Sequence, residues 1–167
     1  MTEAEKRKLN QQRQEISLKN TFFNRYLLLR YSLALFFFSN LYWLLIQLTT
    51  RSWLLVLPSI LIVLTILACI EQFKLYGKKE VRLTHTKRAM QVQVGVQVFS
   101  VIGVMTPWFS ALFPIFATSV LARLFILTLL GIGLALLLFN LRRMEQIETN
   151  TDRAYLRYRQ MEKSILR

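Results

Sequence analysis

The residues that most often carry catalysis are few in this chain and far apart in sequence. His85 is the only histidine, and no carboxylate lies close enough in sequence to orient it; Cys69 is the only cysteine and lies within an apolar run. The chain has no paired-carboxylate site, no metal-ligand spacing, no Gly-rich phosphate loop and no nucleophile elbow. We therefore expect no catalytic residue, no cofactor and no metal, and we expect that the protein is not an enzyme.

Polar and small residues inside otherwise apolar runs are the remaining candidates for a functional site. Polar groups are costly in a membrane unless they face protein or water, and small residues let helices approach closely. The fullest series has spacings of three and four, which place it on one face of a helix. Two interpretations remain open, namely packing between helices and the wall of a water path. The candidates are Asn40, Gln47, Gln93, Gln97, Ser100, Gly103, Pro107 and Gly131.

Four apolar runs position these residues, at 31–49, 53–73, 91–113 and 120–141. Each is near the ~20 residues that an α-helix needs to cross a bilayer. Backbone groups in lipid find partners only within helices or closed barrels. The sequence therefore predicts an all-α, polytopic membrane protein. Its transmembrane domain, residues 31–141, is expected to hold four transmembrane helices in two hairpins, joined by a loop at 74–90.

The Lys and Arg residues lie on alternate sides of these runs. Seven fall in residues 1–30, six in 74–90 and seven in 142–167, while only Arg51 and Arg123 lie elsewhere. Because basic loops stay in the cytoplasm, we predict a multi-pass protein of the cell (cytoplasmic) membrane with both termini in the cytoplasm. This topology accounts for the net charge of +13. We therefore expect contact with anionic lipids and no binding of nucleic acid.

The two basic terminal segments, 1–30 and 142–167, are predicted to form amphipathic helices. The C-terminal one is expected to continue the helix of the fourth run. Each stripe is suited either to the lipid surface or to a partner helix. The apolar stripes consist of Leu9, Ile16 and Phe23 in the first segment, and of Ile147, Ala154, Tyr158, Met161 and Ile165 in the second.

One ion pair is predicted at the inner boundary of the first hairpin. Counted from the turn near Arg51, Arg30 lies 21 residues back and Glu71 lies 20 residues forward. In an antiparallel helical hairpin these two residues sit at nearly the same depth. We therefore predict an Arg30–Glu71 pair, with Lys74 as the competing local partner of Glu71.

These patterns favour a non-enzymatic accessory or regulatory subunit of a membrane complex. The predicted turns on the outer side are short, so any soluble partner is expected on the cytoplasmic side. Within the membrane we expect a protein partner or a homo-oligomer. The alternative is a small transporter or channel, which would have to be oligomeric because four helices leave little room for a pore.

Several short stretches carry a resemblance to a known group of proteins. They are FNRYLLLRY at 23–31, FFFSNLYW at 36–43, EQ at 71–72 and YGKK at 76–79. With these stretches the chain resembles uncharacterised four-span membrane proteins of Gram-positive bacteria. Some of those proteins are labelled as the IIA subunit of a cellobiose-type sugar phosphotransferase system. That label implies a soluble helical protein with an active-site histidine, whereas the only histidine here lies in a loop between apolar runs, so no site residue is carried over.

Overall fold

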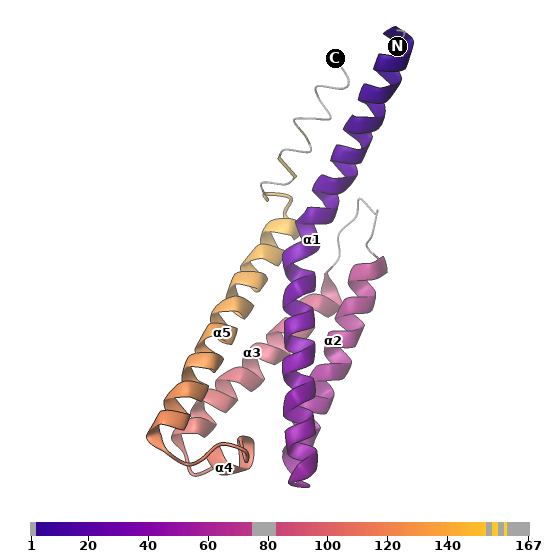
Figure 1. Ribbon diagram of the computed structural model, residues 1–167. Coiled ribbons are helices and arrows are strands. Elements are labelled where there is room, and N and C mark those ends of the chain that lie inside the picture. The colour runs from indigo at the N-terminus through magenta and orange to yellow at the C-terminus, as the bar shows by residue number, and fades with distance from the viewer. Residues whose placement is uncertain (1–2, 75–82, 153–154, 157–158, 160–167) are drawn as a thin grey trace.

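The computed structural model of the chain is all-α (Figure 1) and describes residues 3–74, 83–152, 155–156 and 159. Five α-helices and one short 3-10 helix make up this described part of the chain. The predicted all-α class is therefore confirmed. In chain order the elements are α1 (Glu3–Thr49), η1 (Trp53–Leu55), α2 (Val56–Lys74), α3 (Thr84–Met105), α4 (Phe109–Leu112) and α5 (Val120–Glu148).

Three of these helices are long and apolar enough to cross a membrane. The candidate spans are Tyr26–Thr49 of α1, Trp53–Lys74, which joins η1 to α2, and Val120–Glu148 of α5. The first, second and fourth predicted runs therefore correspond to candidate spans. The third does not: α3 contains only residues 91–105 of that run, three of them glutamine, and its earlier turns carry Lys87 and Arg88. The chain is thus a candidate multi-pass membrane protein with three candidate spans among its described residues.

The third predicted run also ends earlier than expected. We predicted one helix over 91–113, but α3 stops at Met105 and the chain turns before the single turn of α4. Pro107 explains the break, since proline has no backbone N–H and disfavours helical geometry in the residue before it. Thr106 accordingly adopts an extended conformation, with φ of −107° and ψ of 172°. This break carries the chain sideways toward α5.

The basic N-terminal segment and the first apolar run form one uninterrupted helix. α1 has 47 residues, which at 1.5 Å each gives a length of about 70 Å. No glycine or proline interrupts it. It ends at a tight turn in which Arg51 has a φ of 48°. As Figure 1 shows, the N-terminal part of α1 extends well past the ends of the other helices.

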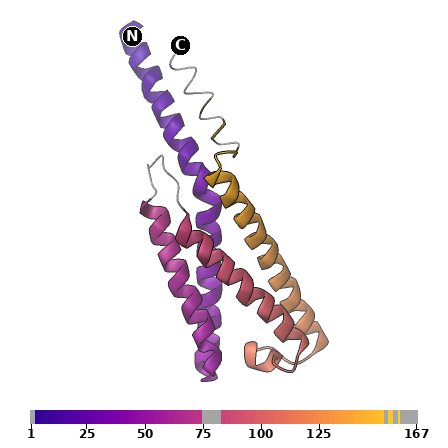
Figure 2. The ribbon, with the colours of Figure 1, turned by 180° about the vertical axis from the view of Figure 1, so that it is seen from behind.

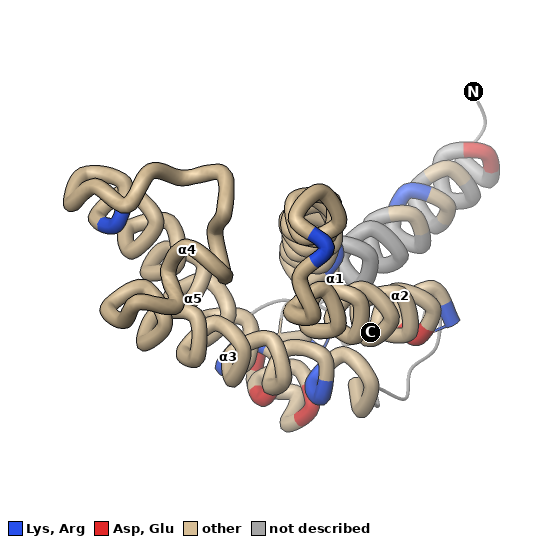
Figure 3. The backbone as a smooth tube through the Cα atoms, turned by 90° about the horizontal axis from the view of Figure 1, so that it is seen from below, with Lys and Arg blue, Asp and Glu red and all other residues tan. Residues whose placement is uncertain are grey.

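The helices pack in a chain of neighbours rather than a closed ring. The extensive contacts join α1 to α2, α2 to α3, and α3 to α5, whereas α1 and α5 meet only over a short length. Seen from behind, α3 runs diagonally between α2 and α5 (Figure 2). Seen from below, the backbone of α5 near α4 lies away from that of α1 (Figure 3), whereas Trp43 and Gln47 of α1 reach α4 through their side chains. The bundle therefore converges at one end and spreads at the end that carries α4.

Two separate cores hold the two ends of the bundle. The convergent end is closed by buried side chains from four helices, among them Leu29 of α1, Ala68 of α2, Met90 of α3 and Met144 of α5. The α4 end has a smaller core of Val104, Phe109 and Ile126. Between these two cores, α1 and α5 diverge.

The C-terminal segment departs from the prediction of one continuous helix. α5 does extend past the fourth apolar run, but it ends at Glu148, and Asn150 adopts a positive φ of 54°. The chain therefore turns before the remaining residues. Ile147 is fully buried in the core, so it does not belong to an exposed stripe. The other four residues of that stripe lie outside what the structure describes: Ala154, Tyr158, Met161 and Ile165.

Candidate functional site

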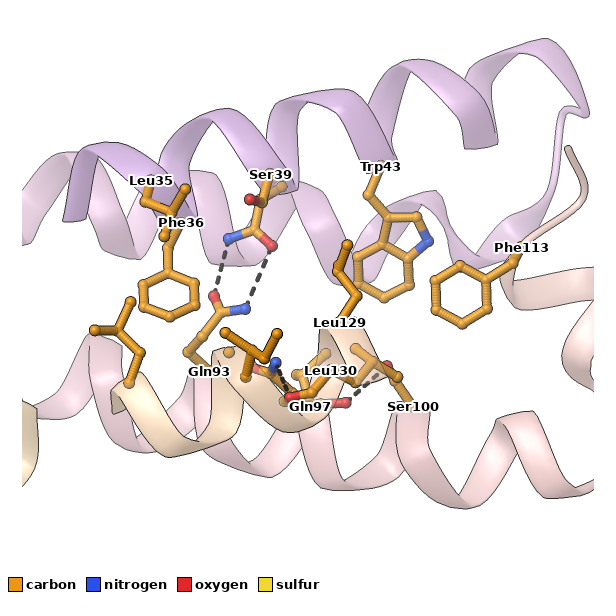
Figure 4. Close-up of a pocket in the computed structure, with 15 residues that line it drawn as sticks. Leu35, Phe36, Ser39, Trp43, Gln93, Gln97, Ser100, Phe113, Leu129 and Leu130 are labelled. Atoms are coloured by element: carbon orange, nitrogen blue, oxygen red, sulfur yellow. Dashed lines mark hydrogen bonds between the residues drawn. The ribbon is translucent and has the colours of Figure 1, made fainter. Parts of the chain in front are cut away.

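The polar face of α3 meets side chains from α1 at the middle of the bundle. Asn40 Nδ2 donates to Gln93 Oε1 at 2.8 Å, and Gln93 Nε2 donates to Asn40 Oδ1 at 3.4 Å. Figure 4 shows this reciprocal pair of bonds between two facing amides. Each amide thereby satisfies one donor and one acceptor of the other. Two residues from different apolar runs, both predicted as candidates, are brought together here.

Gln97, one turn further along α3, contacts α5 instead. Its Nε2 donates to the backbone carbonyl of Leu130 at 2.8 Å. A Cβ atom on Gly133 would collide with this amide, so the glycine makes room for it. Only 7% of Gln97 is exposed, yet its Oε1 has no hydrogen-bond donor among the described residues. The geometry leaves one buried acceptor without a partner.

Gln47 and Trp43 of α1 hold the short helix α4. Gln47 Nε2 donates to the carbonyls of Ala111 at 3.1 Å and Leu112 at 3.0 Å. Trp43 Nε1 donates to the same Leu112 carbonyl at 2.9 Å, and its ring stacks on Phe113 with centroids 6.3 Å apart. The last carbonyls of a helix have no partner within it. These side chains therefore stabilise the end of α4.

The other predicted candidates have differing roles. Ser100 is buried and donates to its own helix, from Oγ to the Val96 carbonyl at 2.9 Å. Gly103 is buried against α4, where a Cβ atom would collide with Leu112 Cδ1. Pro107 is exposed in the turn after α3.

Gly131 does not lie at a helix contact in the described part of the chain. It is exposed, and a Cβ built on it meets nothing within 4 Å. Gly133 lies two residues along α5, about 200° around the helix, and it is the glycine that makes room for a side chain of α3. The predicted role of Gly131 in packing or in a water path stays a prediction.

A cavity of about 390 Å³ lies between α1, α3 and α5 and is lined in part by the amides of Asn40, Gln93 and Gln97 (Figure 4). Its walls are mainly aliphatic and aromatic, and the lining includes no Asp, Glu, Lys, Arg or His. The site therefore offers neutral hydrogen-bonding groups within an apolar wall. The lining residues are Leu35, Phe36, Ser39, Asn40 and Trp43 of α1, Gln93, Val96, Gln97 and Ser100 of α3, Leu129, Leu130, Ile132, Gly133 and Leu136 of α5, and Phe113.

Glu71 of α2 caps the N-terminus of α3. Its Oε1 accepts from the backbone N–H of His85 at 2.9 Å, and its Oε2 accepts from the N–H and hydroxyl of Thr86 at 2.7 and 2.8 Å. α3 needs this acceptor because its N-cap residue, Leu83, makes no side-chain capping bond. A carboxylate is favoured at a helix N-terminus by the unpaired N–H groups and by the helix dipole.

The predicted Arg30–Glu71 ion pair stays a prediction, since the contacts described for the Glu71 carboxylate are its bonds to His85 and Thr86. The depth argument did not consider backbone N–H groups at the start of a helix as partners of Glu71. An ion pair that joins two helices is Lys87–Glu148, with Nζ and Oε2 3.3 Å apart.

Sequence reasoning also missed a buried polar residue on α5. Asn140 is fully buried, and neither polar atom of its side chain has a hydrogen-bond partner among the described residues. Gln72 of α2 is likewise buried with an unpartnered amide. Asn140 is the only asparagine in the fourth apolar run, which is the signal that could have marked it.

The described residues contain no group of three or more His, Cys, Asp or Glu that could hold a metal ion. Comparison with known proteins adds no relative: no family model, no curated protein and no solved structure matches this chain. The resemblance drawn from the sequence therefore stays a prediction.

Proposed function

We propose that this protein is a non-enzymatic accessory or regulatory subunit of a membrane complex, and that it binds its partner on the cytoplasmic side. The observation that carries the proposal is the long N-terminal extension of α1. Of the 47 residues of this helix, the candidate span takes up 24. The other 23 extend for about 35 Å beyond it. A rigid extension of this kind presents a surface to a partner without any separate domain.

The extension carries exposed apolar side chains among polar ones. Leu9 and Ile16 are 37% and 58% exposed. They lie seven residues apart, so they share one face of the helix with the exposed side chains of Gln12 and Arg13. An apolar stripe of this type suits a partner helix. The side chain of Phe23, the third residue of the predicted stripe, lies outside what the structure describes.

The proposal includes α3 as a fourth span. Its 22 residues give a length of about 33 Å, sufficient for the ~30 Å hydrocarbon core. Its low hydropathy is offset because Gln93 and Gln97 bond to protein groups on α1 and α5. A polar helix is tolerated in lipid when its polar face is covered by other helices. Both termini then lie on one side, which the positive-inside rule makes the cytoplasm.

Single cysteines test this topology in a Cys69→Ala background. Ala117, in the exposed segment between α4 and α5, should react with an impermeant thiol reagent in intact cells or spheroplasts when replaced by cysteine. Thr149, just after α5, should react only after the membrane is permeabilised. Labelling of Thr149→Cys from the outside would refute the orientation.

Partner binding is tested by co-purification from membranes in a mild detergent. Wild type should retain a foreign protein in fixed stoichiometry, and Leu9→Ser combined with Ile16→Ser should lose it. Gln12→Ser is the matched control, because it changes an exposed residue on the same face without removing apolar surface. A double variant that keeps its partner as well as the control would contradict the proposal.

The second candidate is a small oligomeric transporter or channel, and the cavity is the observation that favours it. The polar stripe of α3 argues the other way, because its amides bond to α1 and α5 rather than facing a continuous polar path. A cysteine at Ser100, which lines the cavity, decides between them. Rapid labelling by a small water-soluble thiol reagent would favour the transporter, together with solute flux in liposomes.

A further inference from the structure

The lining of the cavity between α1, α3 and α5 includes exposed apolar side chains from the two diverging helices: Leu35 is 54% exposed, and Leu129 and Ile132 are 57% and 68% exposed. Toward α4, Trp43 stacks on Phe113, and both line the cavity. α1 and α5 contact each other only over a short length, which points to an opening between them at the side of the bundle.

With the candidate spans placed across a bilayer, as proposed above, the cavity lies at the depth of the hydrocarbon. Asn40, on its wall, is the fifteenth of the 24 residues of the candidate span Tyr26–Thr49. A molecule that enters between α1 and α5 at this level comes from the interior of the bilayer. The volume of about 390 Å³ falls in the range of pockets that hold small ligands, which are mostly apolar with a few placed polar groups.

One polar group in the cavity lacks a partner. Gln97 is held by its Nε2 bond to the Leu130 carbonyl, and Gly133 leaves room for it there. This arrangement leaves Oε1 as an acceptor, buried and without a donor among the described residues. By contrast, the amides of Asn40 and Gln93 bond to each other. An occupant that donates one hydrogen bond beside the Gln97 amide would complete the site.

The lining also sets the charge of the occupant. No ionisable side chain lines the cavity, and a charged group buried there would be without a counter-ion. An occupant with an apolar body would pack against the aliphatic and aromatic lining, and one neutral donor on it would bond to the free acceptor. We propose that this cavity binds a neutral, single-chain lipid with a hydroxyl group, which enters from the bilayer between α1 and α5 and donates to Gln97 Oε1.

Trp43, on the cavity wall, provides the readout. Trp53 and Trp108 are exposed, so both are replaced by Phe to leave Trp43 as the only tryptophan, which is excited selectively over tyrosine. The protein is placed in nanodiscs of dioleoylphosphatidylcholine, and a long-chain alcohol brominated at mid-chain is added as a quencher. Saturable quenching of Trp43 is expected. The methyl ether of the same alcohol, which cannot donate, should bind about fivefold more weakly, the ratio that one neutral hydrogen bond provides.

Three variants separate site binding from general partition into the bilayer. Gln97→Leu should bind the alcohol as weakly as wild type binds the ether. Ser39→Phe places an aromatic ring at the edge of the cavity from an exposed position and should abolish saturable quenching. This variant tests the site independently if Gln97→Leu does not fold. Thr128→Phe is the matched control, because Thr128 is an exposed hydroxyl residue on α5 that does not line the cavity, and it should leave quenching unchanged.

Several results would overturn the proposal. Linear quenching that is equal in wild type and Ser39→Phe would mean that the alcohol only dissolves in the bilayer. Equal affinity for alcohol and ether would remove the role of Gln97, and tighter binding of the corresponding ionised fatty acid would refute the neutral class. A homo-oligomer that Ser39→Phe disrupts, without saturable quenching in wild type, would show that a second copy fills the cavity. None of these results depends on whether the N-terminal extension binds a partner.

Discussion

Replacing Glu71 by alanine is expected to destabilise the protein by about 2 kcal/mol, because α3 would lose the group that caps its N-terminus. The carboxylate belongs to α2, so this cap also ties the end of one helix to the start of the next. The carboxylate oxygens lie 2.9 Å from the backbone nitrogen of His85, 2.7 Å from that of Thr86 and 2.8 Å from the Thr86 hydroxyl.

The magnitude follows from these contacts. Loss of a capping side chain costs ~0.5–2 kcal/mol, and a carboxylate beside the positive end of the helix dipole adds ~0.3–1 kcal/mol. Glu71 is half-buried, so solvent screens part of the charge contribution and the lower half of the dipole range applies. Glu71→Gln keeps one acceptor and loses the charge, and it should therefore cost about half as much as Glu71→Ala.

The assay is equilibrium unfolding in mixed micelles of dodecyl maltoside and sodium dodecyl sulfate, followed by circular dichroism. Thr86→Val removes only the hydroxyl partner, and its double-mutant cycle with Glu71→Ala should give a coupling of about 1 kcal/mol. Glu148→Gln is the control, because it breaks the partly exposed pair with Lys87 and should cost less than ~0.5 kcal/mol. Coupling of Glu71 to Arg30 instead of to Thr86 would refute this reasoning and favour the ion pair predicted from sequence.

Three further predictions concern the interior of the bundle and use the same unfolding assay. Asn40→Leu and Gln93→Leu should be coupled by about 0.6 kcal/mol and by no more than ~1.7 kcal/mol, because each removes the same reciprocal bonds; strictly additive effects would contradict the pairing. Gly133→Leu should lower the free energy of unfolding by about 1–3 kcal/mol, because the new side chain collides with Gln97. Gly131→Leu should be nearly neutral, because its Cβ meets open space. Equal losses of stability in the two variants would show that the wrong face of α5 has been assigned. Gly103→Leu should displace α4 and shift the emission of the single-tryptophan protein that retains Trp43, and an unchanged spectrum would mean that α4 does not depend on this close approach.

Much of the architecture was readable from the order of residues, because it depends on local composition. Apolar runs of sufficient length specify helices wherever a chain must pair its own backbone groups in lipid, and the three candidate spans fall on three of the four predicted runs. The helical period also placed Gln93 and Gln97 together on one face of α3 before any contact was known. Pro107 marked the end of α3 in principle, but the apolar residues beyond it concealed that break.

Tertiary structure alone decided which groups face one another. The sequence placed Asn40 and Gln93 within separate runs, but their bond depends on the rotation and tilt of α1 against α3, which the many side chains of both cores set together. The same holds for Glu71, whose depth was predictable while its partner was not, because the competing donors are backbone N–H groups that become available only where α3 begins. The cavity is the clearest case: it arises because α1 and α5 converge at one end and diverge at the other, and no residue pattern within a single helix records the angle between two helices.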